Sequence, residues 1–176
     1  MPTPIAQHIE LLQRMPIFGA IREEALRFLL EQVQSRSVPA GELFFRQGDE
    51  ALCMYVLERG RVTIRRSWND LEVVLGEFGP GDCFGEMALL DLSARSASVW
   101  AEMDCQALII CPEHLLRLFE TDPEQFALIQ MNLGRELARR LRVTDERLFQ
   151  ALMGHRDSEP VRGAAPADPL MPMGSI

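Results

Sequence analysis

The sequence predicts a mainly β fold with flanking helices: a β jelly-roll barrel that follows a helical leader and precedes one long helix. Between residues 38 and 110 the apolar residues alternate with polar ones and glycines recur, which is typical of short strands joined by turns. On either side of this segment the apolar spacing is helical. We expect three parts: the barrel with its leader over residues 1–122, the long helix over 123–154 and a tail over 155–176.

The leader is predicted to run to about Pro39, because apolar residues between 21 and 33 recur at helical spacing among charged ones. The clearest hairpin follows in the barrel. Apolar residues alternate with their neighbours on both sides of SWND (67–70), which is interpreted as the turn. One face of each strand is expected in the core, and about eight such strands would form a jelly-roll barrel.

The long helix is predicted to begin near Pro123, since proline suits a first helical position, and to end near Gly154. Its leucines recur at four- and seven-residue steps and form one seam: Leu133, Leu137, Leu141, Leu148 and Leu152. Either its own barrel or a second copy of the helix could fill this seam, the latter as in a short parallel coiled coil. Residues 155–176 contain four prolines and no apolar periodicity, which predicts a disordered tail.

Composition argues against several classes of protein. A net charge of −8 disfavours a nucleic-acid surface, and no apolar run is long enough for a membrane span. The start of the chain lacks the features of a signal peptide, so a cytoplasmic location is expected.

Metal and catalytic sites are not expected either. The four cysteines are spread singly, without a CxxC pair, and are interpreted as buried reduced thiols: Cys53, Cys83, Cys105 and Cys111. The three histidines fall outside the strands, which disfavours a metal site inside the barrel. Because the sequence shows no nucleophile and base pair and no cluster of carboxylates, we predict no catalytic residues and no enzyme activity.

The strongest candidate site lies between Phe84 and Ala101. Gly85 would let the backbone approach a ligand, and three amides at a helix N-terminus could bind a phosphate, those of Glu86, Met87 and Ala88. The Glu86 carboxylate would suit a ribose hydroxyl.

Arg95 and Ser96 complete the candidate site. The guanidinium of Arg95 can donate two parallel hydrogen bonds to phosphate oxygens, and Ser96 adds a hydroxyl. Taken singly, a glutamate in a first helical turn and an arginine on a loop also have ordinary structural explanations.

The motif FGE followed by small and apolar residues, an arginine eleven positions after the phenylalanine and an alternating strand resembles the phosphate-binding cassette of cyclic nucleotide-binding domains. Ala94 departs from the pattern, since many members have proline there. The segment ELARRLRVTDERL (136–148) is similar to the dimer helix of the cAMP receptor protein family. This second resemblance favours a homodimer through residues 133–152.

The same resemblance implies roles for further residues. Thr144 would reach an adenine amino group, and Asp145, where the family has serine, would contact nucleotide from the partner subunit and leaves the choice between adenine and guanine open. Ile64 and Leu75 fall where apolar residues line the nucleotide, although both could equally be core residues. Gly76 replaces a serine near the ligand, so one hydrogen bond would be lost.

The expected function is that of a stand-alone cyclic nucleotide sensor that binds cAMP, or alternatively cGMP, and needs no cofactor. It would act by repositioning the long helix against an unidentified effector protein. Two alternatives stay open: a dimerising interaction module that does not depend on nucleotide, and a transcriptional regulator of the cAMP receptor protein family. DNA binding is not expected, because the sequence after the long helix contains no pattern for a helix-turn-helix.

Overall fold

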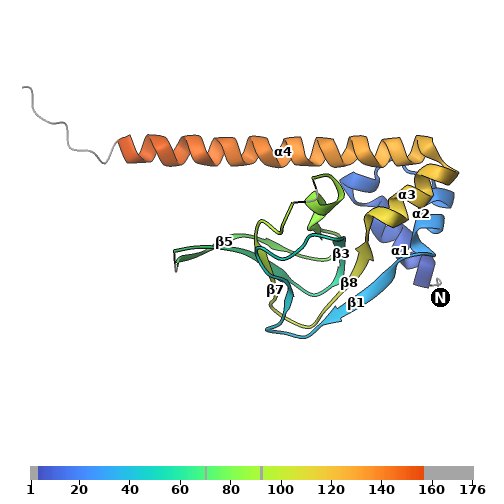
Figure 1. The fold of residues 1–176 in the computed structure, drawn as a ribbon, viewed down its shortest axis with the longest axis horizontal. Helices are drawn as coiled ribbons and strands as arrows, with labels where there is room; N and C mark the ends of the chain where they lie inside the picture. Colours follow the sequence, from blue (N-terminus) through green and yellow to red (C-terminus); the bar gives the residue numbers. More distant parts are fainter. Residues whose placement is uncertain (1–3, 70, 92, 157–176) are drawn as a thin grey trace, which may run out of the picture. The chain divides into compact units, whose positions relative to one another are not determined.

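The computed structural model describes residues 4–69, 71–91 and 93–156, and divides into two compact units, Met1–Leu137 and Ala138–Ile176. The described residues of the first unit form eight strands and most of the helices. Figure 1 shows their arrangement. Its helical elements are α1 (Pro4–Gln13), η1 (Pro16–Phe18), α2 (Glu23–Leu30), η2 (Glu86–Leu89), α3 (Pro112–Thr121) and the first part of α4 (Pro123–Arg156). Its strands are β1 (Gln34–Val38), β2 (Leu43–Phe45), β3 (Met54–Arg59), β4 (Val62–Trp68), β5 (Leu71–Phe78), β6 (Cys83–Phe84), β7 (Ser98–Ala101) and β8 (Cys105–Ile110).

The strands form two four-stranded antiparallel sheets, in the orders β1-β8-β3-β6 and β2-β7-β4-β5. This arrangement confirms the predicted jelly-roll architecture with helices before and after it. The predicted leader extended to about Pro39, whereas strand β1 already begins at Gln34. Periodicity did not indicate β1 because its sequence, QSRSV, is polar and mostly exposed at the edge of its sheet.

Two apolar clusters stabilise the first unit. One joins α1, α2, α3 and the start of α4 to one face of the β3–β8 ladder, and Figure 1 shows α1, α2 and α3 gathered at one end of the sheets. The other fills the space between the sheets. Strand β3 contributes Met54 and Val56 to the first cluster and Tyr55 and Leu57 to the second, so it is buried on both faces.

The predicted hairpin is present, with Asn69 at φ +46 between β4 and β5. The expectation that each strand turns one face to the core is wrong for most of β5, although Phe78 at its end packs against the cluster between the sheets. Leu71, Val73 and Leu75 are all exposed, and Leu75 retains 48% of its accessible surface. Because β5 is the last strand of its sheet and pairs only with β4 within the described chain, these side chains have no core to enter. The interpretation of Leu75 as a core residue is therefore also wrong.

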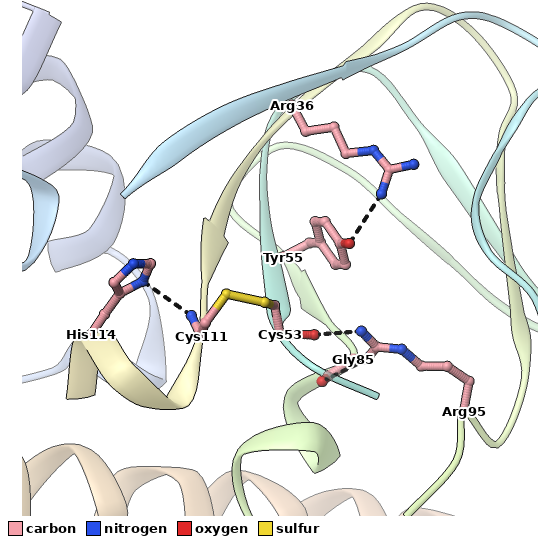
Figure 2. Close-up of a disulfide and its surroundings, with 7 residues drawn as sticks. All are labelled: Arg36, Cys53, Tyr55, Gly85, Arg95, Cys111 and His114. Atoms are coloured by element: carbon pink, nitrogen blue, oxygen red, sulfur yellow. Dashed lines mark hydrogen bonds between the residues drawn. A yellow bond between two sulfur atoms is a disulfide. The ribbon is translucent and has the colours of Figure 1, made fainter. Parts of the chain in front are cut away.

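The prediction of four reduced cysteines is wrong for two of them. Cys53 and Cys111 form a disulfide, whereas Cys83 and Cys105 are buried thiols (Figure 2). The register of the sheet explains the pairing, since Met54 lies opposite Ile110 and the next residues outward are the two cysteines. Their Cα atoms are 4.2 Å apart although 58 residues separate them in sequence.

Helix α4 begins at Pro123, as predicted, and ends at Arg156, two residues beyond the predicted end. Within the first unit, Leu133 is buried in the helical cluster, so the start of the leucine seam packs on its own core. In the second unit Leu141, Leu148 and Leu152 are exposed. Of the predicted tail, residues 157–176 lie outside the described residues. Across the residues that are described, no helix has the length and apolar character needed to cross a membrane.

Candidate functional site

The segment that joins β6 to β7 carries the predicted phosphate-binding residues. Strand β6 ends at Phe84, the four-residue 3₁₀ helix η2 follows, and Arg95 lies on the loop that leads into β7. Between β6 and η2, Gly85 adopts φ +73, the left-handed region that favours glycine. This turn starts η2, and the first amides of any helix have no acceptor within it.

Arg95 is the central cation of this segment, and its residue retains only 7% of its accessible surface. Its Nη1 donates to the carbonyl of Gly85 at 3.1 Å, and its Nη2 donates to the carbonyl of Cys53 at 2.6 Å (Figure 2). Among the described residues, no group accepts a hydrogen bond from its buried Nε. A guanidinium has five N–H donors, so these two bonds leave capacity for an anion.

The approach of Arg95 to Gly85 explains why glycine is needed there. A Cβ atom added to Gly85 would lie 2.5 Å from Nη1 of Arg95, which is closer than two such atoms can pack. Glycine at position 85 therefore permits both the positive φ and the close approach of the Arg95 guanidinium. The prediction from sequence assigned this glycine to the approach of a ligand, whereas in the structure it admits the arginine.

The backbone around Arg95 is anchored to the turn after β2. The amide of Arg95 donates to the carbonyl of Asp49 at 2.8 Å, and the amide of Gly48 donates to the carbonyl of Arg95 at 2.9 Å. Above the ring of Phe45, the guanidinium carbon lies 4.0 Å from the ring centroid, a cation–π contact. These contacts hold the side chain in one place before any ligand arrives.

Burial lowers the pKa of Arg95, and the nearby Tyr55, Asp49 and Glu86 oppose part of this effect. An arginine still keeps its charge at neutral pH. The segment therefore holds a desolvated cation, the environment in which an added anion interacts most strongly.

The other predicted residues of this segment differ in exposure. Glu86 is buried, Met87 is exposed at the surface of η2, and Ser96 is exposed one residue after Arg95. The backbone of Ala88 lies within η2. The structure thus brings these residues and Arg95 together on one turn and the loop after it.

Ile64 and Leu75 lie on the neighbouring strands β4 and β5. Ile64 is half-buried and packs against the cluster between the sheets, and it pairs with Gly76 in the ladder. Leu75 is exposed, so its side chain is available to a ligand or a partner.

Thr144 and Asp145 belong to the second unit, where both lie exposed on α4. The hydroxyl of Thr144 donates to the carbonyl of Arg140, one turn earlier in the same helix, at 3.0 Å. Because these two residues and Arg95 belong to different units, contact of Thr144 and Asp145 with the ligand stays a prediction.

Reasoning from the sequence did not identify the groups that hold Arg95. The Cys53 carbonyl and the ring of Phe45 come from elements far away in sequence, and a backbone carbonyl has no sequence signature. The aromatic residues of strands β2, β3 and β6 were the only available signal, since Phe44, Phe45, Tyr55 and Phe84 pack ring against ring near this site. Throughout the described residues, no group of three or more His, Cys, Asp or Glu could hold a metal ion.

The model of the cyclic nucleotide-binding domain family matches residues 35–122. This match covers half of the chain, from β1 to the end of α3, and includes Gly85 and Arg95. The chain belongs to the cyclic nucleotide-binding domain family.

Several members of the cyclic nucleotide-binding domain family are similar to this chain. The cyclic AMP receptor protein of Thermus thermophilus is 37% identical over 131 residues, which are 74% of this chain and 59% of that protein. The cAMP-dependent protein kinase type II regulatory subunit of Drosophila melanogaster is 38% identical over 92 residues, 52% of this chain and 24% of that protein. The crystal structure of the Thermus thermophilus catabolite activator protein aligns with a TM-score of 0.69 and 36% identity, covering 77% of this chain and 62% of that one. The chain thus spans less than two thirds of the length of these relatives.

Proposed function

We propose that this protein is a regulatory sensor that binds a cyclic nucleotide, with cAMP as the first candidate and cGMP as the alternative. The observation that supports this proposal is Arg95, a buried arginine held by two backbone carbonyls whose Nε has no partner among the described residues. A singly charged cyclic phosphate would supply the missing acceptor and neutralise the cation. The names of two relatives, which mention cyclic AMP and cAMP, support the choice of first ligand.

Different residues around Arg95 would contact different groups of the ligand. The amides of Glu86, Met87 and Ala88 and the hydroxyl of Ser96 would donate to the phosphate. The buried Glu86 carboxylate would accept from the ribose hydroxyl.

The base and the sides of the ligand would be recognised by other elements. Thr144 and Asp145 on α4 would contact the base, where a carboxylate accepts from the amino group of adenine or of guanine. Ile64 and Leu75 would contact the ligand from the β4–β5 hairpin. A ligand that touches both the barrel and α4 favours one arrangement of the two by its difference in affinity, which is how we expect the signal to pass to an effector protein.

The exposed leucines of α4 support a homodimer through residues 133–152. Leu141, Leu148 and Leu152 lie on one face of the helix at seven- and four-residue spacing, and all three are exposed in the single chain. A second copy of the helix would cover them, as in a two-stranded coiled coil.

Calorimetric titration of ligand-stripped protein with cAMP, cGMP and a cyclic dinucleotide tests the proposal. We expect cAMP or cGMP to bind with a dissociation constant well below millimolar. Arg95→Ala should weaken that binding by at least about tenfold, because a charge-assisted bidentate contact contributes about 1.5–3 kcal/mol.

Arg14→Ala is the matched control, since it removes the same charge from an exposed position near the end of α1. It should leave the affinity unchanged. If no nucleotide binds, the sensor proposal fails, and a dimer that persists without ligand would favour the interaction module. If Arg95→Ala binds as tightly as the wild type, the ligand occupies another site.

A further inference from the structure

The disulfide between Cys53 and Cys111 lies where the sheet meets both the candidate site and the helices. Cys53 immediately precedes β3, and Cys111 immediately follows β8 and forms the N-cap of α3. In Figure 2 the bridge leaves Cys53 on one side and the guanidinium of Arg95 lies on the other, at the carbonyl of Cys53. The bridge therefore connects the start of β3 to the end of β8, where α3 begins.

One end of the bridge contacts the cation of the site directly. The carbonyl of Cys53 accepts from Nη2 of Arg95 at 2.6 Å, the shorter of the two bonds that hold the guanidinium. Residues 51–53 lie outside any strand or helix, and the neighbouring Leu52 is exposed. The carbonyl that holds Arg95 is thus on an irregular loop that the disulfide ties to the sheet.

The other end of the bridge belongs to the helical part of the first unit. The amide of Cys111 donates to Nδ1 of His114 at 3.1 Å, within the first turn of α3 (Figure 2). The capped start of α3 is therefore covalently linked to the loop that holds Arg95.

The two bridged cysteines differ from the other two in accessibility. Cys53 and Cys111 are each partly exposed, whereas Cys83 and Cys105 are buried. Burial also raises the pKa of the Cys105 thiol, which keeps it protonated and a poor nucleophile. The two bridged residues thus retain accessible surface that the two buried thiols lack.

We propose that the Cys53–Cys111 disulfide positions Arg95 for its anion, so that the affinity for cyclic nucleotide depends on the thiol–disulfide state of this pair. This inference rests on the proposed function. A dithiol reduces the bridge by attack of one thiolate on a sulfur, which gives a mixed disulfide, and its second thiol then closes a cyclic disulfide. The dithiol thereby transfers two electrons and two protons to the bridge, and Cys53 and Cys111 become thiols.

Reduction frees the Cys53 loop, and its carbonyl no longer stays fixed beside the guanidinium. Arg95 then has to be ordered when the ligand binds, which lowers the affinity. We expect reduced protein to bind cAMP about 3- to 10-fold more weakly than oxidised protein, the effect of one imperfectly held hydrogen bond.

The test is calorimetric titration of the same preparation with cAMP in its oxidised, dithiol-reduced and re-oxidised forms. Thiol counts in denaturant should give two for the oxidised protein and four for the reduced protein. The affinity should fall on reduction and recover on re-oxidation. The Cys53→Ser/Cys111→Ser variant should bind like reduced protein and ignore the dithiol. Cys105→Ala keeps the bridge and should respond to the dithiol as the wild type does.

A thermal unfolding curve of each form shows whether it is folded at the titration temperature. This measurement separates a loss of affinity from a loss of fold. Equal affinity of folded oxidised and reduced protein, within twofold, overturns the redox inference and leaves the sensor proposal intact. Four thiols in air-oxidised protein overturn it as well. If neither form binds a cyclic nucleotide, the proposed function fails and this inference fails with it.

Discussion

Arg95 shows how a single buried residue can be prepared for a ligand by backbone groups. Moving a cation out of water costs several kcal/mol unless it is paired. Two carbonyls and the rings of Phe45 and Tyr55 surround the guanidinium, yet burial still lowers its pKa, so the cost is compensated only in part. A phosphate at this position would accept from Nε of Arg95, a donor that is already ordered and has no acceptor in the described part of the chain. At the scale of the residue, the chemistry of the site is thus set by what surrounds the guanidinium.

Gly85→Ala tests this arrangement without touching the charge. The new Cβ would clash with Nη1 of Arg95, and the positive φ would add about 1–2 kcal/mol of strain. We expect the affinity for cAMP, measured by calorimetry, to fall at least about tenfold and the unfolding midpoint to decrease.

Gly79→Ala is the control for this substitution. No described atom lies within 4 Å of a Cβ added there, and its φ is not in the left-handed region. Affinity and stability should stay close to those of the wild type. A Gly85→Ala protein that binds cAMP normally would show that the position of Arg95 does not control the site.

At the scale of the elements, the sheet containing β4 and β7 is stabilised by a polar cluster on its outer side. Glu102 follows β7 and accepts from the hydroxyl of Thr63 at 2.5 Å and from Nη2 of Arg65 at 2.8 Å. The guanidinium of Arg65 also lies over the ring of Trp100. These contacts tie the end of β7 to the middle of β4.

Glu102→Gln should lower stability in a pH-dependent way. The hydrogen bond from Thr63 and that from Arg65 lower the pKa of Glu102 in the folded protein. Such a carboxylate stabilises the fold above its unfolded pKa of about 4.3, and this contribution disappears as the pH falls through the lowered folded value. In urea titrations the wild type should therefore have a higher free energy of unfolding than the variant at pH 7. This difference in free energy should shrink below about pH 4.

Glu50→Gln removes the same charge from an exposed loop and controls for net charge. A difference between wild type and Glu102→Gln that is constant from neutral to acidic pH would contradict the role given to this carboxylate.

The disulfide should also stabilise the β3–β8 ladder as a whole. Closing a loop of 58 residues removes entropy from the unfolded chain that corresponds to about 4 kcal/mol, and measured effects are typically about 2–4 kcal/mol. Reduction should lower the free energy of unfolding by that amount in urea titrations with and without a dithiol. The Cys53→Ser/Cys111→Ser variant should match the reduced protein, and a reduced protein as stable as the oxidised one would refute the prediction.

At the scale of the whole molecule, alternation predicted the strands of the barrel and the β4–β5 hairpin, and Pro123 indicated the start of α4, because each of these has a local signal in the sequence. It did not predict β1, whose residues are polar, or the exposure of β5, which depends on its place at the edge of a sheet. Periodicity did not predict the disulfide either, because the pairing of Cys53 with Cys111 depends on the register of β3 against β8.

The motif from Gly85 to Arg95 was recognisable in the sequence because its residues lie close together along the chain. Their acceptors were not, since the Cys53 carbonyl reaches Arg95 from 42 residues away. Local motifs therefore predicted the ligand class, whereas the preparation of the site required the fold.

The seam on α4 leads to a prediction about assembly. Leu141→Asp places a charge on the exposed face that carries Leu148 and Leu152, so it should turn a dimer into a monomer in sedimentation velocity experiments. Gln150→Glu adds the same charge on the opposite face of the helix and should leave the dimer intact. A monomeric wild type at micromolar concentration would refute the dimer.

If the ligand contacts α4 as we propose, assembly and ligand binding must be coupled. Thermodynamic reciprocity requires that cAMP strengthens the dimer by the same factor by which dimerisation strengthens cAMP binding. Leu141→Asp should then weaken the affinity for cAMP although this residue is remote in sequence from Arg95, and saturating cAMP should lower the dimer dissociation constant of the wild type by an equal factor. Titration calorimetry and sedimentation measure the two factors independently. A monomeric Leu141→Asp protein with wild-type affinity would show that a single chain binds the nucleotide alone and that Asp145 does not contribute from a partner helix.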